Sequence, residues 1–323
     1  MGAIAALNLE AGHEADVTVV CRSSYHTAKS QGYTIHSCDH GHLENWYPSD
    51  VVNAVPPTDR NGNPFDYIVC ATKNIADAPP RLTEILRPAV AKNTIIVLIQ
   101  NGLNIEKPFF ATYPTTPVLS GVSLIGVNEP QPAVIQQDFP DTLYVGAFHN
   151  PALDPQFEEA AAKDFVRRYS AGGKTHCEHS PDVGYTRWRK LVYNATLNPI
   201  SALTSLDTGR LRLAPGALDG LVRPAMREIV AAARAVGYEL PDTIVEDQIE
   251  VDPLELYLPP SMLQDVRKGG LIEFETIVGE PLREGERAGV GMPTVRVLYE
   301  LCRAVQWRTM EEKGLVKVPE KET

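Results

Sequence analysis

The chain has 323 residues, 43% of them hydrophobic and 22% charged, and its formal net charge is -11 at pH 7. The length suits two domains or one large one, and the composition excludes a globally disordered chain. Because an acidic chain gains little from releasing counterions on a phosphate backbone, the charge argues against nucleic acid as a partner.

The first part of the chain alternates helical and strand patterns. Residues 2–12 predict a short helix of Ala and Leu that is closed by Gly12. Uninterrupted runs of β-branched residues within 16–22, 65–72 and 93–102 predict strands that are covered on both faces, as in a parallel sheet.

Three further segments complete this first part. Residues 117–148 predict more strands, for which antiparallel pairing is open, and 155–169 predict a helix. The stretch 37–64 predicts a long loop.

The second part is mostly helical. Ser180 and Pro181 predict an N-cap and a first helical position, and long amphipathic segments follow at 215–236, 259–278 and 293–307.

We therefore expect an α/β fold in which a Rossmann-type, doubly wound parallel sheet precedes a mostly α-helical domain. The predicted parts are an NADP-binding domain over 1–178, which lacks its first strand, a helical substrate and catalytic domain over 179–310, and a polar tail over 311–323.

The cysteines and the apolar runs exclude several classes. The 5 cysteines are odd in number and none forms a C-x-x-C pair, so we expect reduced thiols and no metal site. No apolar stretch approaches the roughly 18 residues that span a bilayer, and no basic region followed by an apolar run marks a secretory signal. The sequence thus predicts a cytoplasmic protein that has no membrane partner.

The start of the chain indicates a dinucleotide site. The helix over 2–12 resembles the segment after the second glycine of G-x-G-x-x-G, with Gly2 in the place of the third glycine. The first strand and two glycines would then be absent, and an ordinary N-terminal helix is the alternative. Arg22, followed by Ser23 and Ser24, ends the next strand, where an arginine suits the 2′-phosphate of NADP.

Two more polar residues follow predicted strands. Lys73 comes after the strand at 65–72, and Asn101 opens an Asn-Gly turn after the strand at 93–102. Because strand carboxyl ends line the ligand crevice of open α/β sheets, both side chains are candidates for cofactor binding. A solvated loop lysine and a plain turn are the alternatives.

The helical part holds a row of polar residues at one spacing. Lys190, Asn194 and Asn198 are four apart, which places them along one helix face. Asparagine is a poor residue inside a helix, so two on one stripe indicate either donors that line a cleft or a solvated face.

A second cluster lies at 260–275. Ser261, Asp265 and Glu273 are candidates there, and the apolar context of Glu273 predicts a raised pKa unless a cation is near. Ser261 as an N-cap with Asp265 as a first-turn acid is the alternative, and Glu275 is expected at the surface.

Together these motifs resemble the ketopantoate reductase family, within the larger group of 6-phosphogluconate dehydrogenase-like enzymes. The resemblance covers nearly the whole chain and rests on order and spacing. Its pieces are Gly2 and the helix to AGH, the strand that ends in Arg22, ATK at 71–73, QNG at 100–102, K-L-x-x-N-x-x-x-N-P at 190–199, PSMLQD at 260–265, Glu273 with Gly279, and GVGMPT at 289–294.

The resemblance implies an NADPH-dependent reductase that converts 2-dehydropantoate (ketopantoate) to pantoate in pantothenate biosynthesis. It implies Lys190 as general acid and Glu273 as the assisting carboxylate, both catalytic. It further implies substrate binding by Asn194, Asn198, Ser261 and Asn101, and cofactor binding by Gly2, Arg22, Lys73 and Asn101. The expected partner is a small 2-keto acid, and a homodimer is left open.

Two alternatives stay beside this interpretation. One is a reductase of another 2-keto acid, or a related amine-forming reaction, on the same fold. The other is a non-catalytic paralogue with an impaired cofactor site, which the incomplete glycine motif favours and the full set around Lys190 and Glu273 opposes.

Overall fold

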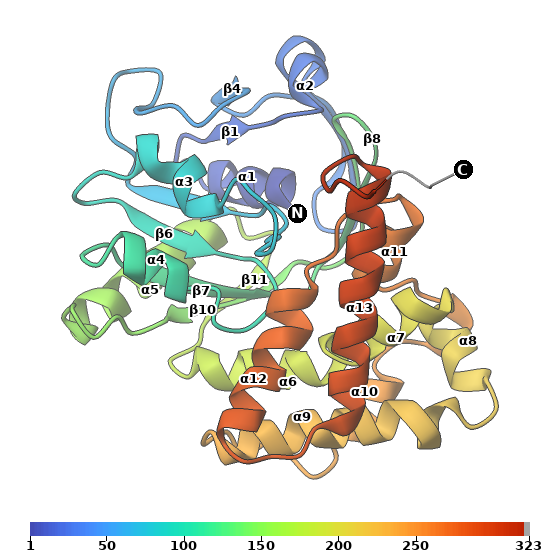
Figure 1. The fold of residues 1–323 in the computed structure, drawn as a ribbon. Coiled ribbons are helices and arrows are strands. Elements are labelled where there is room, and N and C mark those ends of the chain that lie inside the picture. The colour runs from blue at the N-terminus through green and yellow to red at the C-terminus, as the bar shows by residue number, and fades with distance from the viewer. Residues whose placement is uncertain (320–323) are drawn as a thin grey trace. The chain divides into compact units, whose positions relative to one another are not determined.

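The computed structural model describes residues 1–319. Its first part contains a five-stranded sheet in the order β11-β10-β7-β6-β5, to which apolar runs of the sequence contribute (Figure 1). Strands β5, β6 and β7 are parallel, whereas β10 runs antiparallel to β7 and parallel to β11. Their bounds are β5 Tyr67–Cys70, β6 Ile95–Leu98, β7 Val118–Ser123, β10 Thr142–Ala147 and β11 His176–His179. The parallel α/β sheet predicted from sequence is therefore confirmed for the runs at 65–72 and 93–102. The run at 16–22 instead forms β1, Thr18–Val20, which lies in a separate two-stranded sheet and is only partly buried.

A second sheet has four strands in the order β3-β2-β9-β8. Its members are β2 Tyr33–Ser37, β3 Gly41–Trp46, β8 Gly126–Gln131 and β9 Val134–Phe139. The pairs β2–β3 and β8–β9 are antiparallel, and β2 and β9 are parallel. Antiparallel pairing within 117–148, left open by the sequence, is thus present.

The long loop predicted over 37–64 is wrong in part. It contains β3 and also β4, Asp50–Val52, which pairs in parallel with β1, Thr18–Val20. Strand β3 escapes detection because most of its residues are polar and exposed, so it lacks an apolar run.

Helix α1, Gly2–Ala11, is buried along most of its length rather than on one stripe. It packs against α5, Pro155–Ser170, and both segments were predicted to be helical. The buried polar side chain of Asn8 donates to Asp141 Oδ2 at 2.7 Å and so keeps its amide paired. The smaller helices of this part are α2 Tyr25–Gln31, α3 Leu82–Leu86, the 3₁₀ turn η1 Arg87–Ala89, and α4 Lys107–Thr112.

The rest of the chain is helical, as predicted. Its elements are α6 Val183–Asn194, α7 Leu197–Thr204, α8 Thr208–Leu213, the π-helical turn η2 Leu218–Val222, α9 Arg223–Ala235, α10 Ile244–Glu250, the 3₁₀ turn η3 Leu254–Leu256, α11 Ser261–Arg267, the π-helical turn η4 Glu275–Gly279, α12 Glu280–Arg287 and α13 Pro293–Glu312.

Two predicted helix positions need correction. Helix α6 begins at Val183, so Ser180 is not its N-cap: the Ser180 N–H donates to Val145 O at 2.7 Å and prolongs the pairing of β11 with β10. The segment predicted as continuous over 259–278 breaks after α11, where Gly269 adopts a φ of 61°.

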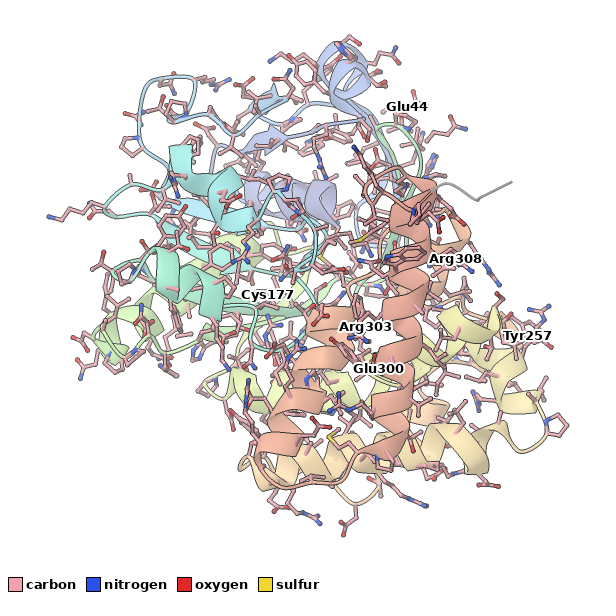
Figure 2. All side chains as sticks on the ribbon, viewed as in Figure 1. Glu44, Cys177, Tyr257, Glu300, Arg303 and Arg308 are labelled. Carbon is pink, nitrogen blue, oxygen red and sulfur yellow. The ribbon has the colours of Figure 1, made fainter. Side chains whose placement is uncertain are left out.

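Helix α13 extends beyond the predicted 293–307 and enters the tail predicted over 311–323, whose last four residues lie outside the described residues. Its charged residues include Glu300, Arg303 and Arg308, which Figure 2 labels, and its exposed residues include the apolar Val297, Leu301 and Trp307. Arg303 pairs with Glu300 at 2.6 Å. Of the helices within residues 1–319, none combines the length and the apolar character needed to cross a bilayer.

The chain divides into two units. Unit 1 comprises residues 1–73, 80–100 and 105–183, and unit 2 comprises 74–79, 101–104 and the chain from 184 on. Two short segments that follow strands β5 and β6 therefore belong with the helices, so that Asn101 lies in the same unit as Lys190 and Glu273. The domain boundaries predicted from the sequence, after residues 178 and 310, stay predictions.

Candidate active site

Lys190 is anchored in the C-terminal part of α6. Its ammonium Nζ donates to Asn101 Oδ1 at 2.7 Å, although the two residues are 89 positions apart. Burial, and after it the nearby Arg187 guanidinium, lowers the pKa of Lys190 to about 8, and the Glu273 carboxylate opposes both. Within unit 2, Lys190 thus has Asn101 as a hydrogen-bond partner and feels the charge of Glu273, and the roles that the resemblance implies for these residues stay predictions.

Glu273 lies just before η4 and is 5% exposed. Its Oε1 accepts a hydrogen bond from the Asn74 N–H at 2.8 Å. Because a carboxylate that accepts from a backbone amide is held in one orientation, Glu273 is fixed relative to the 74–79 segment.

The Asn-Gly turn at 101–104 is tied to the helices by its backbone. Arg187, 4% exposed, donates to Gly102 O at 2.8 Å, and the Leu103 N–H donates to Thr276 O at 2.8 Å. Gly102 has a φ of 106°, and a Cβ there would lie 2.5 Å from the Thr276 Cβ, so only glycine fits. The backbone around Asn101 is therefore rigid, and Asn101 offers Lys190 a fixed partner.

The stripe of Lys190, Asn194 and Asn198 does not lie on one continuous helix, contrary to the expectation from spacing. Helix α6 ends at Asn194 and α7 begins at Leu197. Pro199 explains the break, because a proline has no N–H for the carbonyl four residues earlier and its ring clashes with that carbonyl. Asn198 is therefore carried by a different helix from Lys190.

Asn198 is 2% exposed, and its Oδ1 has no hydrogen-bond partner within the described residues. The same holds for Oγ of the fully buried Ser201, one turn later on α7. By contrast the hydroxyls of Thr196 and Thr204 donate to the carbonyls four residues before them. Buried polar atoms without partners are costly, and a ligand is one explanation of them.

Asn194 is 8% exposed, whereas Ser261 is exposed at the first position of α11. The N-cap of α11 is Pro260, so the alternative that made Ser261 an N-cap and Asp265 a first-turn acid is wrong. Glu275, expected at the surface, instead accepts from Arg283 and Tyr299 at 2.9 and 2.8 Å.

The predicted cofactor residues lie in unit 1. Gly2 opens α1, where no acidic residue occupies the first turn, and a Cβ on Gly2 would lie 3.5 Å from the Ala71 Cβ beyond β5. Arg22 and Lys73 are exposed and follow β1 and β5. The Ser24 hydroxyl, two residues after Arg22, donates to Glu129 Oε1 at 2.5 Å.

The N-terminus of α1 and the two exposed cations that follow β1 and β5 are of the kinds that bind the phosphates of a dinucleotide. The fit concerns the types of these residues and their places in unit 1, at strand ends and at the start of a helix.

The sequence reasoning missed Arg187 and Asn74. Arg187 precedes Lys190 by three residues, so helical periodicity gives a signal for it. Asn74 acts through its backbone N–H, 199 positions from Glu273, and no pattern of side chains marks such a contact.

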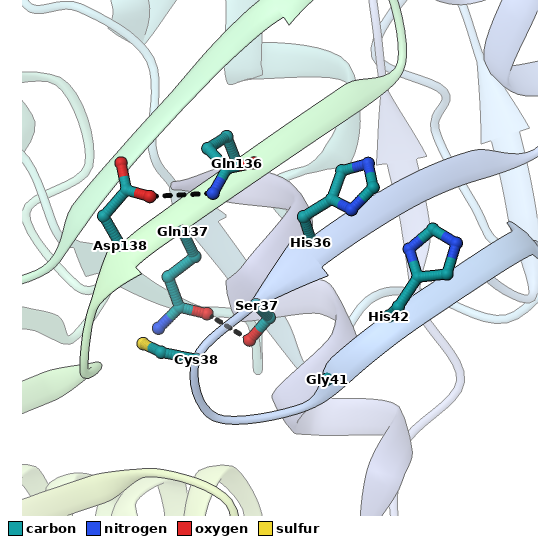
Figure 3. A pocket seen from close by; sticks show the side chains of 8 residues that line it. All are labelled: His36, Ser37, Cys38, Gly41, His42, Gln136, Gln137 and Asp138. Atoms are coloured by element: carbon teal, nitrogen blue, oxygen red, sulfur yellow. Dashed lines mark hydrogen bonds between the residues drawn. The ribbon is translucent and has the colours of Figure 1, made fainter.

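A cavity of about 410 Å³ lies elsewhere, over strands β2, β3 and β9 (Figure 3). It holds none of the predicted site residues, and its polar side chains bond to one another, as Ser37 does to Gln137 and Gln136 to Asp138. Within residues 1–319, no group of three or more His, Cys, Asp or Glu side chains is arranged to hold a metal ion.

Two family models match the chain. The one described as ketopantoate reductase PanE/ApbA covers residues 1–150, and the one described as the ketopantoate reductase PanE/ApbA C terminal covers 182–306. Together they span both units.

Individual relatives match over most of the chain. The chain is 40% identical to the uncharacterized protein YDL144C of Saccharomyces cerevisiae, over 99% of this chain and 95% of the relative. It is 25% identical to a 2-dehydropantoate 2-reductase of a Nostoc species, over 91% and 88% of the two chains.

Solved structures share the fold. A 2-dehydropantoate 2-reductase from Methylococcus capsulatus matches with a TM-score of 0.79 and 31% identity, over 96% of each chain. D-mandelate dehydrogenase with NADH and anilino(oxo)acetate matches with a TM-score of 0.80 at 20% identity, over 96% of each chain, a likeness of fold alone.

Proposed function

Because the chain belongs to the ketopantoate reductase family, whose members are oxidoreductases, we propose that it reduces 2-dehydropantoate to pantoate with NADPH. The observation that carries the proposal is the Lys190 ammonium on Asn101 Oδ1 at 2.7 Å, with the Glu273 carboxylate close enough to raise the pKa of the lysine. A protonated amine is the proton donor that a ketone reduction needs, and a nearby carboxylate favours its protonated form.

Reduction of a ketone builds negative charge on the carbonyl oxygen. The reduced nicotinamide, when bound, supplies the hydride for the carbonyl carbon. Lys190 then stabilises the developing alkoxide and delivers a proton from Nζ, a contribution of about 10²–10⁴-fold. With a pKa of about 8, Lys190 is mostly protonated at neutral pH and still acidic enough to release that proton.

Glu273 balances the two cations at this site. Burial and Arg187 both disfavour the charged form of Lys190, and the Glu273 carboxylate favours it. Asn101 holds Nζ in place through its Oδ1, so the ammonium does not have to reorganise as the substrate reacts.

The polar side chains of the helical part are proposed to bind the oxygen atoms of the substrate. The unpaired Oδ1 of Asn198 is an acceptor for a substrate hydroxyl, and the Asn194 and Ser261 side chains offer donors for its carboxylate or hydroxyl groups. This set supports a small, oxygen-rich substrate, as a branched 2-keto acid with a hydroxyl is.

The cofactor side rests on Gly2, Arg22 and Lys73. Arg22 would grip the 2′-phosphate with its planar guanidinium, Lys73 would add a second cation, and the N-terminus of α1 at Gly2 would face phosphate oxygens. The preference for NADPH rests on Arg22 above all. The cytoplasmic location and the homodimer stay predictions from the sequence.

The test is NADPH oxidation by the purified chain with ketopantoate and a panel of other 2-keto acids, each with and without ammonia. We expect turnover with ketopantoate at a kcat/KM well above that of the others, and slower turnover with NADH. Faster reduction of another keto acid would move the chain to a different substrate, ammonia-dependent turnover would indicate an amine-forming reaction, and no turnover with any of them would leave the non-catalytic alternative.

A further inference from the structure

Gln306 is a buried amide on the inner side of α13. It is 2% exposed, and its neighbours on that side of the helix include the buried apolar residues Leu298 and Cys302. An amide among apolar side chains is costly unless its groups are paired, so its partners decide whether it is tolerated there.

Those partners belong to two separate segments of unit 2. Gln306 Oε1 accepts from the Ile272 N–H at 2.9 Å, and Nε2 donates to Ile272 O at 3.3 Å. Nε2 also faces both carboxylate oxygens of Asp77, at 3.1 and 3.2 Å. The side chain therefore bridges the backbone before η4 and the 74–79 segment.

The two bridged segments carry the two ends of one hydrogen bond. Ile272 directly precedes Glu273, and neither residue lies in a helix. Asp77 lies three residues after Asn74, whose N–H donates to Glu273 Oε1 at 2.8 Å. Gln306 thus holds both ends of this hydrogen bond: the acceptor Glu273 through Ile272, and the donor Asn74 through Asp77.

We propose that Gln306 is a positioning residue for the Glu273 carboxylate, which it fixes by joining the backbone beside Glu273 to the 74–79 segment that Glu273 accepts from. Gln306 influences the reaction only if Glu273 takes part in it, so this role in turnover rests on the proposed function. The positioning itself is a claim about geometry and has its own measurement.

Hydrogen exchange at the Asn74 amide reports the geometry directly. In Gln306→Leu, which fills the same space without polar groups, we expect the Asn74 N–H to exchange roughly tenfold faster, the loss expected when one anchoring hydrogen bond is removed. Thr309→Val is the matched control, because this hydroxyl lies one turn along α13, is 5% exposed and donates within the helix, to Val305 O at 3.1 Å.

The pH dependence of kcat reports the consequence for Lys190. Because the Glu273 carboxylate raises the pKa of Lys190, that pKa should fall when the carboxylate is no longer held in place. Reduction needs the protonated amine, and the alkaline limb of kcat should therefore move to lower pH in Gln306→Leu and stay in place in Thr309→Val.

If Gln306→Leu does not fold, variants that exchange the amide and the carboxylate between residues 306 and 77 test the proposal instead. Gln306→Glu alone sets two carboxylates against each other and should expose the Asn74 amide at least as much. When Asp77→Asn is added, the amide of residue 77 can donate to the carboxylate of residue 306. That carboxylate still has an oxygen that accepts from the Ile272 N–H, so the double variant should recover most of the protection of the Asn74 amide.

The outcomes separate the two claims. Unchanged Asn74 exchange in folded Gln306→Leu, or no recovery in the double variant relative to Gln306→Glu, overturns the positioning role. Faster exchange with an unmoved alkaline limb overturns its influence on Lys190. If the wild-type chain reduces no 2-keto acid, the proposed function fails, and Asn74 exchange still decides whether Gln306 positions Glu273.

Discussion

The helical site and the cofactor side are held in different ways. In unit 2, Lys190, Glu273 and the turn that follows Asn101 are each tied by a hydrogen bond to a segment far away in the sequence. In unit 1, Arg22 and Lys73 are exposed at the ends of strands. The difference matches the tasks proposed for them: groups that meet developing charge gain from rigid placement, whereas exposed cations need only reach a phosphate.

The largest effect should come from the ammonium itself. Lys190→Met keeps an unbranched side chain that lacks only the terminal nitrogen, and so removes both the charge and the proton; we therefore expect kcat for ketopantoate reduction to fall about 10²–10⁴-fold. Lys163→Met is the control, because its side chain is 60% exposed and pairs with Glu159 on the same helix. Steady-state kinetics at pH 7 measures both, and a loss of less than tenfold in Lys190→Met would remove the role proposed for this lysine.

The next effect tests the rigidity of the turn that carries Asn101. Gly102→Ala places a Cβ 2.5 Å from the Thr276 Cβ at a φ of 106°, which should cost about 2–4 kcal/mol of folding free energy. Gly216→Ala is the control, since its φ is 74° and a Cβ there meets nothing within 4 Å. Denaturant unfolding compares the two variants, and equal losses of stability would mean that the close packing on Thr276 does not matter.

A smaller effect belongs to the cofactor side. Arg22→Met should raise the KM for NADPH about 10–100-fold and change the KM for NADH little, because only NADPH has the 2′-phosphate. Arg60→Met, an exposed arginine of the same unit that donates to Ser49 O, should change neither. If Arg22→Met weakens both cofactors equally, Arg22 does not read the 2′-phosphate.

The smallest effect concerns Arg187. Its guanidinium lowers the pKa of Lys190, so Arg187→Met should move the alkaline limb of kcat to higher pH. Arg187→Lys keeps a cation at this position and should leave the limb near its wild-type place. A limb that moves equally in both variants would point to the lost bond with Gly102 O rather than to charge.

The fold was predictable where strands are apolar and continuous. The runs that became β5 and β6 indicate buried parallel strands, whereas β3 is polar and was missed. The helix break between Asn194 and Leu197 was also missed, although Pro199 is a visible cause of it.

The candidate site was predictable only in part. The polar stripe around Lys190 is visible in the sequence by its spacing, but the partners of Lys190 are not. Gln306 meets Asp77 across 229 positions, and Asn74 meets Glu273 through a backbone N–H, so neither contact leaves a local pattern. Periodicity identifies faces of helices, whereas such contacts depend on how the chain folds back on itself.

The pH dependence of kcat/KM for ketopantoate reduction, measured in the wild-type chain and in Lys190→Met, tests the role of Lys190 most directly. With a pKa of about 8 for Lys190, activity should be retained at pH 7 and fall tenfold per pH unit well above pH 8, and the residual activity of Lys190→Met should lack that limb. A wild-type profile that stays flat to about pH 10, or the same limb in both proteins, would contradict Lys190 as the proton donor.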